Sequence, residues 1–193
     1  GLDSEKTLRI AREPEIDEAV LPDCARRIEL PFGPYRVNAY ALVSSESRAC
    51  ALFDTGTRPD EILEFLRSQD LEPSFVFITH SHHDHTAGLD GLLQRYPGLR
   101  VVAMRSSDYP NAIRTGDGMS HAFAEFTIHA AATPGHASDA VRFRISGDNN
   151  DLLVAGDAIF ARSVGKIPRN YRKSLRIIRD RILGESPDAW ILP

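Results

Sequence analysis

The side chains best suited to chemistry are crowded into FITHSHHDHTAGLDG, residues 77–91. Four of the chain's seven histidines and an aspartate lie within six positions there, directly after a short apolar run. Neutral imidazole is the most common protein ligand for zinc, and aspartate oxygen also binds it. Because both ligand types occur together, the segment predicts a site for two ions rather than one. The candidate ligands are His80, His82, Asp84 and His85.

An alternative explanation of the cluster is a solvated histidine-rich loop or an affinity tag. A tag would be terminal and uniform, whereas this cluster is internal and follows a run typical of a strand. If residues 74–80 form a strand, Ile78 and His80 share one face, and His82 follows on that side. The cluster then lies where a strand ends and a helix begins, a usual place for ligands on α/β scaffolds.

The elements that must position the cluster follow from hydrophobic periodicity and turn residues. Strands with interleaved helices recur in two halves, which favours a layered α/β or α+β sandwich. Segment 105–120 is ambiguous. The expected strands are 26–32, 36–43, 49–56, 74–79, 99–104, 123–133, 140–146, 151–156 and 189–192, and the expected helices are 58–70, 87–98 and 171–183.

The composition limits the function classes. A net charge of −4 disfavours a nucleic-acid surface, and no apolar run reaches the ~20 residues that span a bilayer. Residues 1–23 are polar and charged, unlike a signal peptide, so a cytoplasmic protein is expected. Cys24 and Cys50 have no CxxC spacing and are expected to be buried thiols. We expect a small-molecule substrate and no nucleic-acid or membrane partner, and a homodimer is left open.

Residues 79–88, THSHHDHTAG, carry the signature HxHxDH and resemble the metallo-β-lactamase fold superfamily. His83 falls on a variable letter of that signature. Three further segments resemble motifs of the superfamily. They occur along this chain in the same order as in the superfamily, over about residues 25–193. Each alone would be an ordinary turn or strand end. They are LFDTG (52–56) with Asp54, TPGH (133–136) with His136, and LLVAGDAIF (152–160) with Asp157.

The resemblance implies an α/β fold, an αββα sandwich of two mixed β-sheets flanked by helices. It implies one domain over residues 25–193, preceded by an N-terminal extension, residues 1–24. It also implies two metal sites, the second completed by a further histidine, with an aspartate that bridges the ions. The residues matching the first site are His80, His82 and His136, and those matching the second are Asp84 and His85, with Asp157 as the bridge.

The implied chemistry is hydrolysis of a carbonyl by a metal-bound hydroxide. Two ions ~3.5–4 Å apart lower the pKa of a shared water toward ~7, and one ion polarises the carbonyl oxygen. Catalytic roles are implied for Asp84 and Asp157, while Asp54 would orient a histidine ligand and fix its tautomer. One or two Zn²⁺ ions are expected, with Fe²⁺ or Mn²⁺ as alternatives.

The end of the sequence departs from the superfamily pattern. The last ligand of the superfamily is a histidine in a GHG-like loop after a late strand, but this sequence reads PDAWILP over residues 187–193 and ends. Either the domain is truncated at its C-terminal end, or the second site lacks that ligand. No remaining histidine fits, because His121 is expected in a loop and His129 half-buried on a strand.

Two features narrow the branch of the superfamily. Asp157 separates the chain from true β-lactamases. Residues 160–170, FARSVGKIPRN, resemble glyoxalase II-type hydrolases, in which a lysine lies near the glutathione carboxylate, so Lys166 is the expected substrate-binding residue. Quorum-quenching lactonases share the metal motifs. The resemblance therefore implies a hydrolase of an ester, thioester or lactone, in the glyoxalase II-like or lactonase-like branch, with a hydroxyacylglutathione hydrolase-like activity preferred.

Two alternatives come from other classes. One is a mononuclear iron enzyme resembling persulfide dioxygenases, which a single iron and oxygen uptake would favour. The other is a non-catalytic regulatory member with an incomplete second metal site, which would show no turnover with metal restored. In that case the basic helix 171–181 is a partner surface rather than a solvated face.

Overall fold

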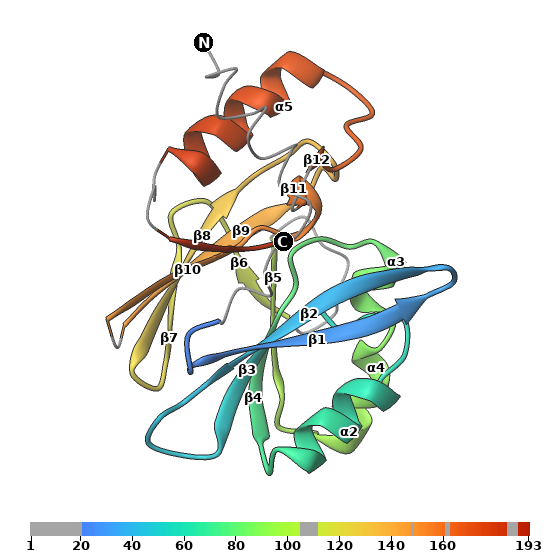
Figure 1. The fold of residues 1–193 in the computed structure, drawn as a ribbon, viewed down its shortest axis with the longest axis vertical. Coiled ribbons are helices and arrows are strands. Elements are labelled where there is room, and N and C mark those ends of the chain that lie inside the picture. The colour runs from blue at the N-terminus through green and yellow to red at the C-terminus, as the bar shows by residue number, and fades with distance from the viewer. Residues whose placement is uncertain (1–20, 105–111, 148, 161–162, 185–188) are drawn as a thin grey trace.

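The computed structural model describes residues 21–104, 112–147, 149–160, 163–184 and 189–193. Two β-sheets face each other, and helices cover their outer surfaces (Figure 1). The predicted α/β fold, an αββα sandwich of two mixed sheets, is confirmed. Most of the expected extension, residues 1–24, lies outside the described residues.

The first sheet has six strands in the order β1-β2-β3-β4-β5-β6. Strands β1 to β3 pair antiparallel, whereas β3 to β6 pair parallel. Three short helices follow its parallel strands. The strands are β1 (Ala25–Phe32), β2 (Tyr35–Val43), β3 (Ala49–Phe53), β4 (Glu72–Phe77), β5 (Arg100–Met104) and β6 (Ile113–Thr115), and the helices are α2 (Asp60–Ser68), α3 (His83–Thr86) and α4 (Leu89–Arg95).

The second sheet has five strands in the order β13-β10-β9-β8-β7, and only the β13–β10 pair is parallel. Helix α5 (Tyr171–Ile178) packs on its outer face and continues into a π-helical turn, Arg179–Leu183. The strands are β7 (Ser120–Phe123), β8 (Phe126–Ala132), β9 (Val141–Gly147), β10 (Asn150–Val154) and β13 (Trp190–Leu192), and a small hairpin adds β11 (Ile159–Phe160) and β12 (Ser163–Val164).

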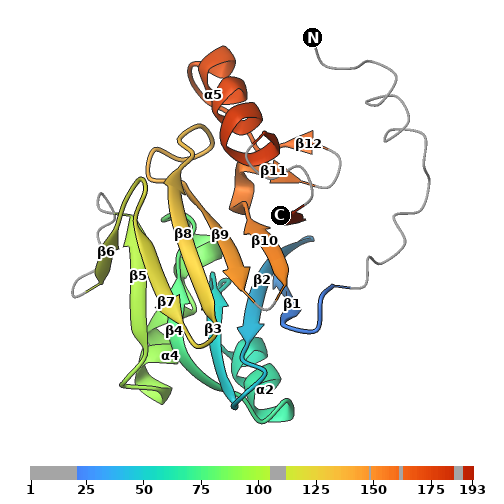
Figure 2. The same cartoon turned by 90° about the vertical axis from the view of Figure 1, so that its left-hand side faces the viewer.

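Both faces of the central strands are buried, so these strands are nearly continuous apolar runs. Alternate residues of β3 and β4 contact the other sheet, and the residues between them contact α2 and α4. Figure 2 shows β7, β8 and β9 stacked over β3 and β4. Aromatic rings fill the space between the sheets: the Phe53 ring centroid lies 5.1 Å from that of Phe77 and 5.8 Å from that of Phe143.

Several predicted boundaries differ from the structure. The strand predicted over 123–133 begins only at Phe126, as β8, because the chain turns at Ala124, whose φ is +47°, after the preceding strand β7. His121 therefore lies on β7 rather than in a loop, and His129 lies on β8 as predicted but is exposed. The helix predicted over 171–183 is α-helical only to Ile178.

Both cysteines, Cys24 and Cys50, are buried free thiols, as the sequence indicates. Burial raises the pKa of Cys50 to about 12, so this thiol is unreactive in the folded protein. Within the described residues, no helix is long and apolar enough to cross a membrane.

Candidate metal centre

The predicted site residues meet at one edge of the sandwich, where strands of both sheets end. Asp54 follows β3, and the histidine cluster follows β4, its parallel neighbour. His136 lies in the β8–β9 loop, and Asp157 lies in a 3-10 turn directly after β10. Parallel strands place their carboxyl ends at the same edge, which explains how segments distant in sequence come together here.

Three imidazoles converge on one point from two distant segments. His82 Nδ1 lies 3.0 Å from His80 Nε2 and 2.9 Å from His136 Nε2. Tetrahedral zinc with bonds of about 2.0–2.1 Å would hold its ligand nitrogens about 3.3 Å apart, which is close to this spacing. These three nitrogens therefore form one group that fits a metal ion.

The proton positions of the first group favour a cation. His136 Nδ1 donates to the Lys166 carbonyl oxygen at 3.0 Å, which leaves the lone pair of its Nε2 facing His82. Burial lowers the pKa of His80 to about 4, so this imidazole is neutral at physiological pH. His82 Nδ1 carries at most one proton, so it cannot donate to both neighbouring nitrogens, whereas a shared metal ion would satisfy all three.

A second group forms beside the first from His85, Asp157 and His80. His85 Nε2 lies 3.3 Å from Asp157 Oδ1 and 3.9 Å from Asp84 Oδ2, and Asp157 Oδ2 lies 3.5 Å from His136 Nε2. The carboxylate of Asp157 is therefore placed between the two groups, where the sequence predicts the bridging ligand. His85 Nε2 is buried without a hydrogen-bond partner among the described residues, which a metal ion would supply.

The charges of the second group also suit a cation. Burial lowers the pKa of His85, but the carboxylates of Asp54 and Asp157 outweigh burial and raise it to about 10. Burial raises the pKa of Asp157, but His85 and the neighbouring histidines outweigh burial and lower it. Without metal, a proton on His85 thus balances the two carboxylates, and a metal ion would replace that proton.

Asp54, for which the resemblance implies an orienting role, contacts both Thr79 and His85. Its φ is +62°, which ends β3 at Phe53 instead of continuing the strand predicted to residue 56. Its buried carboxylate accepts from the Thr79 backbone N–H at 2.8 Å and from the Thr79 hydroxyl at 2.7 Å. It also accepts from His85 Nδ1 at 2.8 Å, which directs His85 Nε2 toward Asp157.

Other predicted residues lie outside the two metal groups or differ from their predicted position. His83 is exposed and belongs to neither group formed within the described residues. Lys166 contacts the site through its backbone carbonyl, while its side chain is exposed, so the substrate-binding role of its ammonium group stays a prediction. His80 follows β4, which ends at Phe77, and so lies in a loop rather than on the predicted strand.

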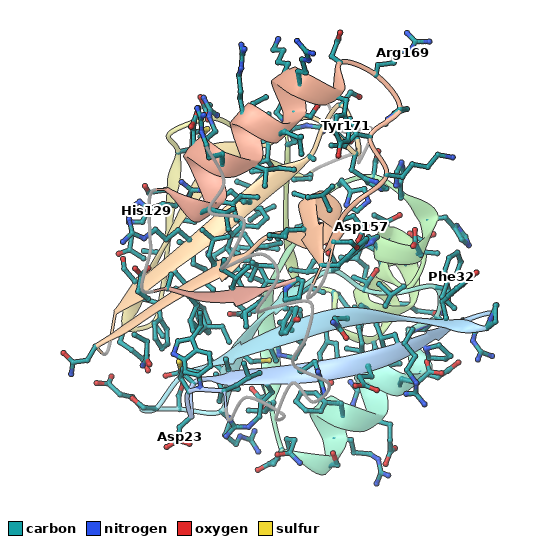
Figure 3. All side chains as sticks on the ribbon, turned by 45° about the horizontal axis from the view of Figure 1, so that its top comes forward. Asp23, Phe32, His129, Asp157, Arg169 and Tyr171 are labelled. Carbon is teal, nitrogen blue, oxygen red and sulfur yellow. The ribbon has the colours of Figure 1, made fainter. Side chains whose placement is uncertain are left out.

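A pocket of about 300 Å³ opens beside the second group. The β1–β2 hairpin forms one wall of this pocket, and the ends of β3 and β10 with α3 form the other. In Figure 3, Asp157 is labelled between the hairpin that carries Phe32 and the Tyr171 end of α5. The lining residues are Phe32, Tyr35, Arg36, Val37, Asn38, Tyr40, Asp54, Asp84, His85, Val154, Gly156, Asp157, Phe160 and Pro193. A larger groove of about 830 Å³ beside α2 and α4 contains no predicted site residue.

Sequence reasoning missed residues that fix the ligands without binding metal. A Cβ on Gly165 would lie 1.7 Å from the Asp157 carbonyl oxygen, so the segment before Lys166 packs directly against the site. A Cβ on Gly156 would lie 2.7 Å from Thr79 Oγ1. The parallel pairing of β3 with β4 could have placed Thr79 beside Asp54, but the contacts of the glycines have no sequence signal.

Comparison with known proteins agrees with this geometry. Residues 32–187 match the family model described as Metallo-beta-lactamase superfamily. The probable metallo-hydrolase YqgX of Bacillus subtilis is 25% identical over 182 residues, covering 80% of this chain and 82% of that protein. A hydroxyacylglutathione hydrolase of Pectobacterium carotovorum is 28% identical over 144 residues, covering 71% of this chain. Thioesterase pkgB of Emericella nidulans is 29% identical over 176 residues, covering 86% of this chain.

The chain spans 55% of that hydroxyacylglutathione hydrolase and 49% of thioesterase pkgB. Among solved structures, the BLEG-1 B3 metallo-beta-lactamase superposes with a TM-score of 0.68 at 22% identity, covering 82% of this chain and 85% of that one. ETHE1 from Myxococcus xanthus superposes with a TM-score of 0.67 at 24% identity, covering 82% of this chain and 69% of that one. At these identities the two likenesses concern the fold.

Proposed function

Because the chain belongs to the metallo-beta-lactamase superfamily, we propose that it is a metal-dependent hydrolase of ester-type carbonyl bonds, with thioesters as the preferred substrates. The observation that carries the proposal is the convergence of His80, His82 and His136 on one point, with Asp157 beside it. Relatives named hydroxyacylglutathione hydrolase and thioesterase support the preference for a thioester.

In this proposal the two groups hold two divalent ions. His80, His82 and His136 would hold the first ion, while His85 and Asp84 would hold the second. Asp157 would contact both, because its two oxygens face His85 and His136. When bound, the ions would supply Lewis acidity toward the carbonyl oxygen and a water of lowered pKa. Zinc is the first candidate metal, with iron and manganese as alternatives.

The pocket beside the second group would hold the substrate. Phe32, Tyr35 and Phe160 are exposed aromatic residues on its rim and suit an apolar acyl group. Arg36 on the same wall, which also pairs with Glu29 at 3.1 Å, and the exposed side chain of Lys166 are the proposed partners for a carboxylate of the substrate. The proposed substrate is a small molecule with an acyl group beside an anionic leaving group.

The test is elemental analysis of the purified protein together with hydrolysis of a panel of thioesters, esters and lactones. Chelated protein should be inactive, and Zn²⁺ or Mn²⁺ should restore hydrolysis, fastest on thioesters. Preference for a lactone would move the activity to the lactonase-like branch. One iron per chain together with oxygen uptake would contradict the hydrolase proposal and favour a dioxygenase activity. No turnover on any substrate with metal bound would contradict an enzymatic role.

A further inference from the structure

We infer that Thr79 is a positioning residue through which Asp54 orients His80, a ligand of the first metal group, while Asp54 itself orients His85 in the second. His85 is held by the Asp54 carboxylate directly, and His80 is held through the Thr79 hydroxyl. The inference rests on the metal centre of the proposed function. It adds that the tautomer of the most deeply buried ligand of the first group is set by a threonine rather than by a carboxylate or a carbonyl.

The directions of these hydrogen bonds are fixed by the chemistry of the groups. Thr79 Oγ1 lies 2.7 Å from Asp54 Oδ2 and 3.1 Å from His80 Nδ1. The Asp54 carboxylate already accepts from the Thr79 N–H and from His85 Nδ1, so it is the acceptor here too, and the single hydroxyl proton of Thr79 points to Asp54. The hydroxyl oxygen must then accept from His80, which places the His80 proton on Nδ1. The lone pair of His80 is therefore on Nε2, the nitrogen that faces His82 at 3.0 Å.

The Thr79 hydroxyl has little freedom to leave this arrangement. The residue is 1% exposed, its backbone N–H donates to Asp54 Oδ1, and its carbonyl oxygen accepts from the Val141 N–H at 2.9 Å. Gly156 packs so closely that a Cβ there would lie 2.8 Å from the Thr79 Cβ. The side chain is β-branched, which restricts χ1 further.

The close contact with Gly156 gives Thr79 a second role. Gly156 has a φ of +51° and directly precedes Asp157, so its approach to Thr79 sets where the bridging carboxylate lies relative to His80. The Val141 N–H bond ties the same residue to the start of β9, in the other sheet. Thr79 thus connects the two sheets and fixes the positions of the two ligand groups relative to each other.

The test compares Thr79→Val with Thr79→Ser in the full chain. Valine keeps the size and branching but removes the hydroxyl, whereas serine keeps the hydroxyl. Competition with a chromophoric chelator should show that Thr79→Val binds Zn²⁺ about 10–100-fold more weakly, the range for lost orienting partners of histidine ligands. Thr79→Ser should stay within about threefold of the natural protein, because the orienting hydroxyl is retained.

Thr133→Val is the matched control. Thr133 is also a buried threonine, 2% exposed, but its hydroxyl has no hydrogen-bond partner among the described residues. Its replacement should leave Zn²⁺ affinity unchanged. Equal losses in Thr133→Val and Thr79→Val would show a general packing effect and would overturn the inference.

A second measurement does not depend on metal binding. Histidine ¹⁵N chemical shifts of the metal-free natural protein should show His80 as the Nδ1–H tautomer, with the signal assigned from a His80→Gln variant. The Nε2–H tautomer would overturn the inference directly. Absence of Zn²⁺ binding by the natural protein would instead defeat the proposed function, and the tautomer would still decide the role of Thr79.

Discussion

At the scale of single residues, the proposed ligands differ in how firmly the protein holds them. His80 and His85 are each 2% exposed and are tied to Asp54, directly or through Thr79. His82 is exposed, and its Nδ1 faces the other two nitrogens of its group. His82 can therefore be removed with little effect on folding, which makes it the best residue for testing the site.

Replacing His82 with alanine should abolish metal binding at the first group and hydrolysis with it. The free energy of unfolding of the metal-free protein should change by only about 0.5 kcal/mol, because the side chain is exposed. The measurements are metal stoichiometry and thioester turnover. His83→Ala is the matched control, since His83 is the exposed neighbour that joins neither group, and it should keep both properties. Full metal content in His82→Ala would contradict the ligand assignment.

Asp157→Asn tests the residue between the two groups. Asparagine keeps the shape but removes the charge that faces His85 and His136, so we expect kcat to fall about 100-fold or more, beyond the loss typical of an orienting partner. The free energy of unfolding of the metal-free variant, measured by urea denaturation, should differ from that of the natural protein by about 1 kcal/mol or less. Unchanged turnover would remove Asp157 from the bridging position.

The sequence identified four of the ligand candidates because their spacing is local, whereas His136 and Asp157 were identified only through the family resemblance. His80, His82, Asp84 and His85 lie in one short segment, and a strand followed by a helix is sufficient to present them. Thr79 was missed because its role depends on the register of β4 against β3 and on Gly156, which comes from the other sheet. Such contacts between distant segments leave no periodic pattern.

At the scale of elements, the site depends on short segments that follow strands. The predicted layers are correct, but the strands expected to run to residues 56, 79 and 156 end earlier, at Phe53, Phe77 and Val154. In each case the chain leaves extended conformation in order to turn a side chain toward the metal centre. After β3 the reason is the positive φ of Asp54, whereas β10 ends because Ala155 already adopts a helical conformation before Gly156.

Gly165→Ala should disturb the segment that carries the Lys166 carbonyl. The new methyl group would meet the Asp157 carbonyl oxygen and His136 Nδ1, so the backbone must shift. We expect a loss of about 1–3 kcal/mol in the free energy of unfolding, typical of overpacking, and weaker binding of Zn²⁺. Gly98→Ala is the control, because a Cβ there has nothing within 4 Å. Equal effects of the two substitutions in urea denaturation would count against this packing.

The turn Arg179–Leu183 is held to the second sheet by an ion pair with a predictable pH dependence. Arg181 donates to Asp117 at 2.6 Å, and although burial raises the pKa of Asp117, the Ala132 N–H and Arg181 outweigh it and lower that pKa below its ordinary 3.8. The lowered pKa means that the stabilisation is complete above the ordinary value and is lost as pH falls through the folded-state pKa.

Asp117→Asn should therefore be less stable than the natural protein at pH 7, by about 1 kcal/mol or less because the pair is exposed. The difference should narrow as pH falls below about 4, where the natural carboxylate is protonated. Urea denaturation of both proteins at a series of pH values measures this difference. If the stability difference between the two proteins stays constant or grows as pH falls, the charge of Asp117 is not the source of the stabilisation.

At the scale of the whole molecule, the metal centre joins the two sheets. His80, His82 and His85 follow a strand of the first sheet, while His136 and Asp157 follow strands of the second. A bound ion would therefore crosslink the two halves of the sandwich, in addition to the apolar core between them and the Val141–Thr79 hydrogen bond. Metal binding to the folded state alone must also stabilise that state by mass action.

Removal of metal should lower the melting temperature. With metal at 1,000 times its Kd, the expected stabilisation is about 4 kcal/mol, or roughly 10 °C for a chain of this size. Differential scanning calorimetry with and without a chelator measures the shift. His82→Ala should show a much smaller metal-dependent shift, since it lacks one ligand of the first group. An identical shift in that variant would indicate metal binding elsewhere on the molecule.

The two walls of the pocket beside the second group come from different parts of the fold, and this has an evolutionary consequence. One wall is the β1–β2 hairpin, which supplies no histidine or aspartate to either metal group, whereas the other wall carries the ligands themselves. In the proposed hydrolase, mutations in the hairpin can therefore change which substrates fit the pocket without altering the proposed metal ligands. Divergence to new substrates then needs changes in one hairpin alone, while the wall that carries the ligands stays as it is.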